Sequence, residues 1–302
     1  MLFRSEDEIL RLTVLYRSAL SSLSVARATS LDHSTVDYLE SLCTRAYFAV
    51  YGTRSRFFQR IARFFAVDWP MAAQALWRET LVSAALGVLG VAVAWLLVGQ
   101  DADWYFAFVD PTLANGRDPS ATTAYLRSTL FDKDSPKNGG EGLSVMATGL
   151  FTHNAQVALF SFALGFAFCL PTAYLMLSNG LMLGAFLKLF SSHGLGIELG
   201  GWLFIHGVTE LWAITLAGAA GFRIGWAIAF PGLLTRVEAA GKAGRQAATL
   251  MCGAVVMLFF AGLLEGFGRQ LVNDTVTRYA IAGATLVMWA AYLYAPRGRR
   301  TG

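Results

Sequence analysis

The chain has 302 residues, of which 55% are hydrophobic and only 15% are charged, and its mean hydropathy is +0.49. This apolar content exceeds what a water-soluble chain of this size can bury, so the composition excludes a soluble enzyme. The net charge of +4 is too small and too scattered to indicate nucleic-acid binding. We therefore expect an integral membrane protein whose first partner is the lipid bilayer.

The N-terminal part carries no apolar run long enough to cross a bilayer and is predicted to be cytoplasmic. Apolar residues recur at three- and four-residue spacing over 9–23 and again over 39–50. Residues 31–35 supply a turn with capping side chains between the two series. The pattern predicts a helical hairpin.

A basic and aromatic segment, residues 54–69, follows the hairpin. Its four arginines are Arg54, Arg56, Arg60 and Arg63, and phenylalanines and an isoleucine lie between them. This pattern favours an amphipathic helix that binds the headgroup layer of the cytoplasmic leaflet over a helix that packs on the hairpin. Pro70 is expected to break this helix before the first span.

Apolar segments that could form membrane helices follow, since a bilayer core about 30 Å thick needs roughly 20 apolar helical residues. The clear ones are 80–98, 155–177, 199–222 and 247–264, and the weaker ones are 181–190 and 280–295. Pro171 is expected to kink the second span near its end. The predicted fold class is an all-α polytopic membrane helix bundle of about six spans, with an N-terminal cytoplasmic helical hairpin.

The charge distribution orients the bundle, because short cytoplasmic loops are enriched in Lys and Arg. Residues 1–79, 222–246 and the C-terminal tail hold 17 basic and nine acidic residues, a net charge of +8. Residues 100–150 hold four basic and seven acidic residues, a net charge of −3. We therefore expect a multi-pass protein of the bacterial inner membrane with both termini cytoplasmic. This orientation requires the weak segment 181–198 to cross or nearly cross, and a five-span chain would place the basic tail outside.

The predicted parts are a cytoplasmic region (1–79), a first span (80–98), an external loop (99–152) and a membrane bundle with a short cytoplasmic tail (153–302). The external loop is too short for a catalytic domain of usual size, and a short helical cap is the expected structure. Turns are expected at 118–119, 134–136 and 138–140. None of the three cysteines lies in this loop, so no disulfide framework is expected.

Glycines recur at four-residue spacing in the membrane half, as in Gly180 with Gly184 and Gly221 with Gly225. Small residues at this spacing let helices approach closely in lipid. We expect Gly180, Gly184, Gly207 and Gly221 to lie at helix contacts, within one chain or between the subunits of a homo-oligomer.

Several polar residues lie inside or at the edge of the predicted membrane region. His206 and Glu210 are four residues apart on one helical face, and a carboxyl near the middle of a span is costly unless it is protonated or partnered. His153 and Asn154 begin the second span, and Asn179 precedes the weak segment. These five are the candidate functional residues.

Three interpretations of His206 and Glu210 are open. They hydrogen-bond each other or neighbouring helices and fix the packing of the bundle, or Glu210 serves a water-filled path for protons or cations. The third is a metal site, for which zinc needs at least one more ligand. The sequence HGVTE lacks the second histidine and the glutamate base of an H-E-x-x-H helix, so the metal ligands are unknown.

Motifs of other chemistry are absent from the sequence. The chain has no G-x-x-x-x-G-K-[ST] phosphate loop, no G-x-S-x-G elbow and no C-x-x-C pair. ATP hydrolysis and serine or thiol catalysis therefore have no sequence support. We predict no catalytic residue and no cofactor.

Short motifs follow one another in a characteristic order along the chain. They are Leu15-Tyr16-Arg17, Ala26-Arg27, Arg45-Ala46-Tyr47, Tyr51-Gly52, Trp69-Pro70, Asn154, Gly165, Asn179-Gly180 with Gly184, His206-Gly207 with Glu210, Gly218-Ala219-Ala220-Gly221 and Pro231-Gly232. In order and spacing the chain resembles the stage II sporulation protein M family of integral membrane proteins. It departs from the family pattern at His153-Asn154, where two asparagines are expected.

The resemblance implies a membrane anchor or scaffold for peptidoglycan-degrading partners, since the namesake of the family is associated with engulfment in spore formers. The family is usually described with about five spans, one fewer than the charge distribution requires. The favoured function is a non-catalytic scaffold of an envelope complex with envelope-protein partners. The alternatives are a transporter or channel with Glu210 and His206 on its path and, with less support, a membrane metallohydrolase.

Overall fold

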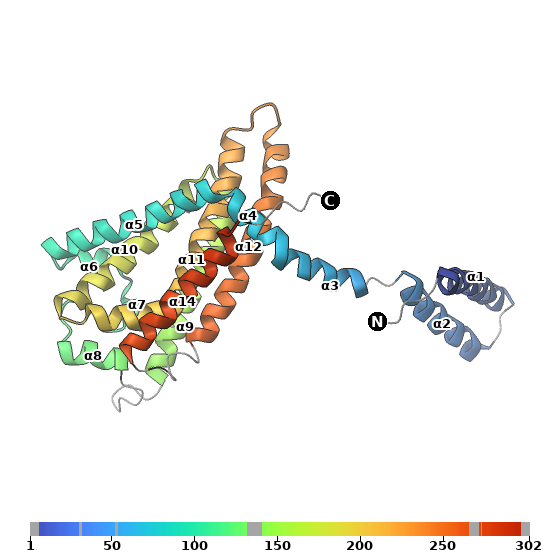
Figure 1. Cartoon of the computed structure of the whole chain (residues 1–302), viewed down its shortest axis with the longest axis horizontal. Coiled ribbons are helices and arrows are strands. Elements are labelled where there is room, and N and C mark those ends of the chain that lie inside the picture. The colour runs from blue at the N-terminus through green and yellow to red at the C-terminus, as the bar shows by residue number, and fades with distance from the viewer. Residues whose placement is uncertain are drawn as a thin grey trace. The chain divides into compact units, whose positions relative to one another are not determined.

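The computed structural model describes residues 6–29, 32–51, 54–131, 141–265, 272 and 274–296, and it describes their side chains except at 6–13, 48–51, 54–56 and 141–150. The described chain is helical and contains no strand (Figure 1). The α-helices are α1 Glu6–Ala28, α2 His33–Tyr51, α3 Arg54–Arg63, α4 Trp69–Ala75, α5 Trp77–Gln100, α6 Trp104–Phe108, α7 Pro111–Ala114, α8 Thr123–Phe131, α9 Glu141–Ala163, α10 Leu170–Ser192, α11 Gly196–Ala229, α12 Arg236–Leu263 and α14 Thr275–Tyr294. The all-α bundle predicted from hydropathy is thereby confirmed.

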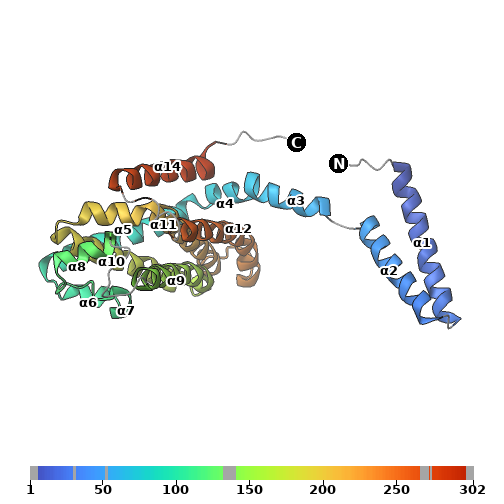
Figure 2. The ribbon, with the colours of Figure 1, turned by 90° about the horizontal axis from the view of Figure 1, so that it is seen from below.

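The chain divides into two compact units at residues 65 and 66. In the first unit α1 and α2 form an antiparallel hairpin (Figure 2). Leu23, Ala26 and Cys43 are buried between the two helices. Arg27 and Glu40 pair across their surface at 2.7 Å. Two helices of this length can bury only a narrow apolar strip between them, and the charged pair lies at its edge.

The segment after the hairpin forms the predicted amphipathic helix α3. Phe57 and Phe58 are 59% and 69% exposed, so α3 does not bury them against the hairpin. Arg60 and Arg63 are also exposed, whereas the side chains of Arg54 and Arg56 lie outside the described residues.

The expectation that Pro70 ends a helix was wrong. Pro70 lies in the first turn of α4, where a missing N–H leaves no intrahelical bond unmade. A π-helical turn, Phe64–Asp68, precedes α4. The break before the first long helix instead falls at Leu76, whose φ of −100° and ψ of 24° are non-helical.

Among the described residues, five helices are long and apolar enough to cross a membrane: α5, α10, α11, α12 and α14. The helix α9 has 23 residues, but the side chains of its first ten lie outside the described ones. Contacts fix its direction: Asn154 bonds to Glu210, and Gly165 meets the backbone of Gly221. Residue numbers therefore increase in the same direction along both helices, so α9 runs parallel to α11.

The predicted second span, 155–177, was wrong as a single helix. The helix α9 ends at Ala163, a 3₁₀ turn follows, and Phe168 and Cys169 have φ values of 56° and 67°. A new helix, α10, then starts with Pro171 in its first turn. Pro171 therefore starts a helix rather than kinking one. The weak segment 181–190 becomes the second half of this full-length helix.

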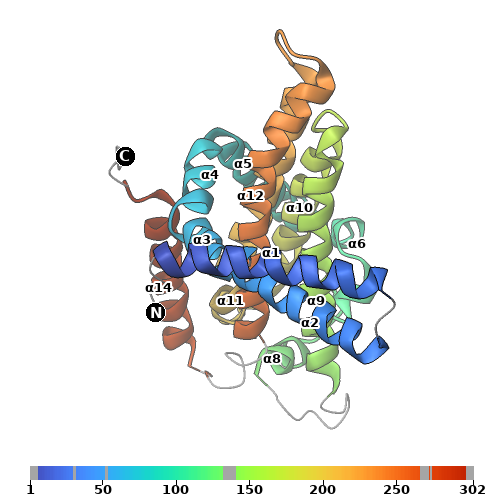
Figure 3. The same cartoon turned by 90° about the vertical axis from the view of Figure 1, so that its right-hand side faces the viewer.

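The pair α11 and α12 is longer than a bilayer core requires. With 34 residues and a rise of about 1.5 Å per residue, α11 extends about 50 Å. Its turn with α12 reaches past the ends of the neighbouring helices (Figures 1 and 3). Thr235 starts α12 in a capping box with Glu238, so the chain turns sharply from α11 into α12.

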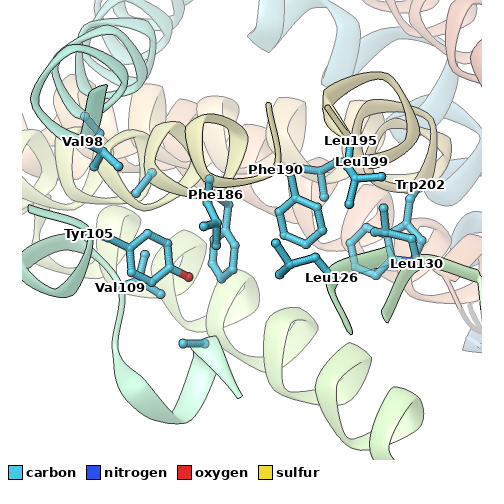
Figure 4. Close-up of a cluster of buried hydrophobic side chains, with 14 residues drawn as sticks. Val98, Tyr105, Val109, Leu126, Leu130, Phe186, Phe190, Leu195, Leu199 and Trp202 are labelled. Atoms are coloured by element: carbon cyan, nitrogen blue, oxygen red, sulfur yellow. The ribbon is translucent and has the colours of Figure 1, made fainter. Parts of the chain in front are cut away.

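A cap of short helices covers the opposite end of the bundle, in the segment 99–152 for which the sequence predicts a helical cap. It consists of α6, α7 and α8, and the predicted turns at 134–136 and 138–140 lie outside the described residues. One buried apolar cluster joins the cap to α5, α10 and α11 (Figure 4). In it the ring of Tyr105 meets that of Phe186 edge-on at 5.9 Å. The cap is thus packed onto the membrane helices like part of a single core.

Candidate functional site

A small cavity lies between α9, α10 and α11 beneath the cap. Its volume is about 60 Å³. The polar residues that line it are Arg117, Asn154, Asn179, His206 and Glu210, and most of the remaining wall is apolar. Four of the five candidate residues from the sequence therefore share one site.

The helix α11 contributes the two most deeply buried of these residues. His206 is 2% exposed and Glu210 is 3% exposed. Because they lie one turn apart, their side chains share a helical face, which α11 turns towards the cavity. Trp202, one turn earlier, sets its ring edge-on to that of His206 at 6.0 Å and limits how the imidazole can turn.

The carboxyl of Glu210 is incompletely satisfied. The side chain of Asn154 on α9 hydrogen-bonds to it, and the carboxylate of Glu265, at the end of α12, adds a like charge nearby. The atom Oε1 of Glu210 is fully buried and has no hydrogen-bond partner among the described residues. A buried oxygen in this state costs free energy until a donor or a cation reaches it.

On α10, Asn179 presents a second oxygen of the same kind. In the part of the chain that the structure describes, its Oδ1 atom is buried without a hydrogen-bond partner, and the residue lines the same cavity. Gly180 follows directly and packs against the backbone of α5 at Gly87. This close contact holds the helix in place, so Asn179 cannot move away from the cavity without separating the two backbones.

Arg117 was not among the sequence candidates. It follows the turn Asn115-Gly116, in which both residues have positive φ, and this turn directs it back under the cap. Its guanidinium donates to the carbonyls of Ala114 at 2.9 Å and Leu113 at 2.7 Å and lies over the ring of Phe186 at 5.2 Å. The residue is only 4% exposed. The cap therefore contributes a fixed positive charge to the cavity.

Tyr105 holds the backbone at this arginine. Its hydroxyl donates to the carbonyl oxygen of Arg117, and burial raises the pKa of Tyr105. The hydroxyl therefore stays protonated and able to donate. In sequence, the Asn-Gly turn before an arginine was the only signal that could have pointed to this residue.

His153 is the candidate that does not reach the cavity. It lies close enough to Asp110, at the start of α7, for their charges to interact, so it faces the cap. Hydrogen bonds from the side chain and backbone of Thr112 lower the pKa of Asp110, which caps α7. His153 is thus associated with the attachment of the cap.

The glycines predicted at helix contacts fall into two groups. A Cβ on Gly180, Gly184 or Gly221 would collide with a backbone carbonyl of a neighbouring helix, at Gly87, Val91 and Ser161 respectively. Gly207 instead lines the cavity, and a Cβ there would meet only the side chain of Leu203 on its own helix. Its small size leaves space in the cavity rather than allowing a close helix contact.

A metal site has no support in the described part of the chain. No group of three His, Cys, Asp or Glu side chains lies close enough there to hold a metal ion. Glu198, at the outer end of α11, pairs with Arg127 of the cap at 3.8 Å instead of turning towards His206.

Comparison with known protein families gives one match over most of the chain and one over its N-terminal part. The stage II sporulation protein M profile matches residues 80–268, which is more than half of the chain and includes every polar residue of the cavity. The chain belongs to the stage II sporulation protein M family. A domain of unknown function, DUF8413, matches residues 2–52, the hairpin of α1 and α2. No curated protein and no solved structure matches the chain.

Family membership identifies the chain as an integral membrane protein. The matched region runs from α5 to just beyond α12 and leaves α14 outside. The cavity is therefore built from the part that the chain shares with its family, and α14 packs against α11 from outside that part.

Proposed function

We propose that this protein is a non-catalytic anchor that organises a complex of the bacterial cell envelope from the inner membrane, with both termini in the cytoplasm. The family match supports a membrane protein, and the charge distribution supports this orientation. In the proposed topology α9 crosses as well, which gives six crossings.

The close packing of the bundle carries the proposal. Gly90 of α5 meets the backbone of α10 at Leu177, and Gly165 meets the backbone of α11 at Gly221. Backbones in such contact cannot slide or rock without losing many van der Waals contacts at once. A bundle of this kind suits a static frame on which partners assemble.

Envelope proteins are the proposed partners, and a homo-oligomer is the proposed form. The paired glycines give the homo-oligomer no support, because Gly180, Gly184, Gly221 and Gly225 all face neighbours within the same chain. On the cytoplasmic side, exposed Phe57 on α3 supports attachment of the first unit to the headgroup layer.

The test is cross-linking in native membranes followed by purification of the full-length protein through a C-terminal tag. We expect envelope proteins to co-purify in stoichiometric amounts and to recover the tagged chain when they are tagged in turn. Mass measurement of the purified complex counts the copies of the chain. Recovery of the chain alone, without any reciprocal partner, contradicts the proposal.

A second candidate function is passage of protons or cations, and the unpartnered Oε1 of Glu210 favours it. The measurement is flux in proteoliposomes for the wild type and Glu210→Gln. A path through Glu210 predicts flux that the substitution abolishes, whereas a static anchor predicts no flux in either protein.

A further inference from the structure

The cavity beneath the cap presents oxygen atoms that lack donors. Oε1 of Glu210 and Oδ1 of Asn179 come from different helices, line the same space and have no hydrogen-bond partner within the described ranges of the chain. An unpaired buried acceptor is stabilised by a hydrogen-bond donor or a cation, not by another acceptor. The ligand that fits this pair is therefore positively charged or rich in N–H or O–H donors.

The charges around the cavity have the same implication. Glu210 and the neighbouring Glu265 carry two carboxylates, and the guanidinium of Arg117 supplies one positive charge. The amides of Asn154 and Asn179 are neutral. A monovalent cation beside the buried Glu210 side chain would neutralise the charge of its carboxylate.

Size narrows the ligand further. A volume of about 60 Å³ holds only a few water-sized molecules, whereas pockets for organic ligands usually span about 300–1,000 Å³. Divalent metal ions are a poor match, because no group of three metal-binding side chains occurs among the described residues. The site has room for an ion and one or two waters.

We propose that this cavity binds one small monovalent cation, ammonium or an alkali ion, between the carboxyl of Glu210 and the amide oxygen of Asn179. Bound there, the ion ties α11 to α10 beneath the cap. The inference depends neither on the anchoring role nor on transport, because an ion can bind without crossing and without any protein partner.

The test is thermal unfolding of the full-length protein in nanodiscs of zwitterionic lipid, titrated with ammonium, potassium or sodium chloride. N-methyl-D-glucamine chloride at equal ionic strength is the reference, because its cation is too large for the cavity. We expect the midpoint to rise and saturate with at least one small cation, as it does for a ligand that binds only the folded state. Equal responses to all four salts overturn the proposal.

Variants locate the site. Glu210→Gln should abolish the saturable rise. Asn179→Ala should raise the half-saturating cation concentration about tenfold, because the ion loses one of its two oxygen contacts. The matched control is Glu198→Gln, a carboxylate of the same helix that pairs with Arg127 outside the cavity, and it should retain the full response. A Glu210→Gln protein that keeps the saturable rise overturns the proposal.

Infrared difference spectra separate a cation from a bound proton, and they remain informative if Glu210→Gln fails to fold. A carboxylate that binds the ion should shift its stretching band when potassium replaces N-methyl-D-glucamine. A protonated-carboxyl band that is unaffected by salt, together with an unfolding midpoint that is equally unaffected, shows that Glu210 holds a proton and overturns the proposal.

Discussion

At the scale of single residues, the contact between Gly87 and Gly180 shows that the effect of an added methyl group depends on the direction in which the new Cβ points. A Cβ on Gly180 would point into the carbonyl oxygen of Gly87, whereas a Cβ on Gly87 would meet nothing within 4 Å. The two residues belong to the same contact, yet only one of them needs to be glycine. The sequence spacing identified Gly180 but could not show which partner it faces.

This asymmetry predicts opposite outcomes for two similar substitutions. Gly180→Ala should lower the unfolding free energy by about 1–3 kcal/mol, because the helices must separate. Gly87→Ala should be neutral or stabilising by up to about 1 kcal/mol, because alanine favours the helix. Reversible unfolding in detergent, compared for both variants, is the measurement. Equal destabilisation by both would contradict the geometry.

The N-cap of α14 predicts a pH dependence. Hydrogen bonds from the side chain and then the backbone of Thr277 lower the pKa of Asp274 from its ordinary value of 3.8. A carboxyl whose pKa is lower in the folded state stabilises it above the unfolded pKa, and this stability is lost as pH falls through the folded pKa. Asp274→Asn should therefore lower the unfolding midpoint at pH 6, with the difference from wild type shrinking below pH 4. A difference independent of pH would contradict the assignment.

At the scale of elements, Arg117 attaches the cap to the membrane helices. Its guanidinium satisfies two carbonyls of the cap and lies on Phe186 of α10. The loop that carries it was counted from the sequence only as part of an acidic external segment. The burial of Arg117 gives it a structural role, because an arginine shielded from water acts through contacts with specific carbonyls and rings rather than through net charge.

Arg117→Met should destabilise the cap by about 1–3 kcal/mol, since buried carbonyls lose their donors. Hydrogen exchange should rise across α6 to α8 more than in α12. Arg127→Met is the matched control, because the side chain of Arg127 is largely exposed in its pair with Glu198, and its loss should change stability by less than about 0.5 kcal/mol. If the two variants behave alike, Arg117 does not hold the cap.

At the scale of the whole molecule, the proposed six crossings place the cap and the turn between α11 and α12 on opposite sides of the membrane. Leu233 in that turn and Ser120 in the cap are both exposed. The three native cysteines are free and can be replaced. Single cysteines at these positions can therefore report the side on which each lies.

We expect Ser120→Cys to react with an impermeant maleimide in intact spheroplasts, and Leu233→Cys to react only after the membrane is permeabilised. A cysteine added to the basic tail, which lies outside the described residues, should behave like Leu233→Cys. Labelling of the tail in intact spheroplasts would instead support five crossings.

The sequence alone determined the membrane class, the helical fold and most of the polar cavity. Hydropathy and helical spacing are local properties, so they identified the apolar helices and placed His206 and Glu210 on one face. Charge distribution added an orientation that the proposed topology keeps, and the family motifs agreed with the match over 80–268.

Only the tertiary structure decided where apolar segments reverse and which distant residues meet. The reversal at Phe168 and Cys169 lies within a continuous apolar run, where hydropathy cannot distinguish a tight turn from a span. The cavity joins the cap to three helices, so its membership depends on packing: it includes Arg117 and excludes His153. Contacts between residues far apart in sequence follow from how backbones fit together, and the local pattern of a sequence does not encode that fit.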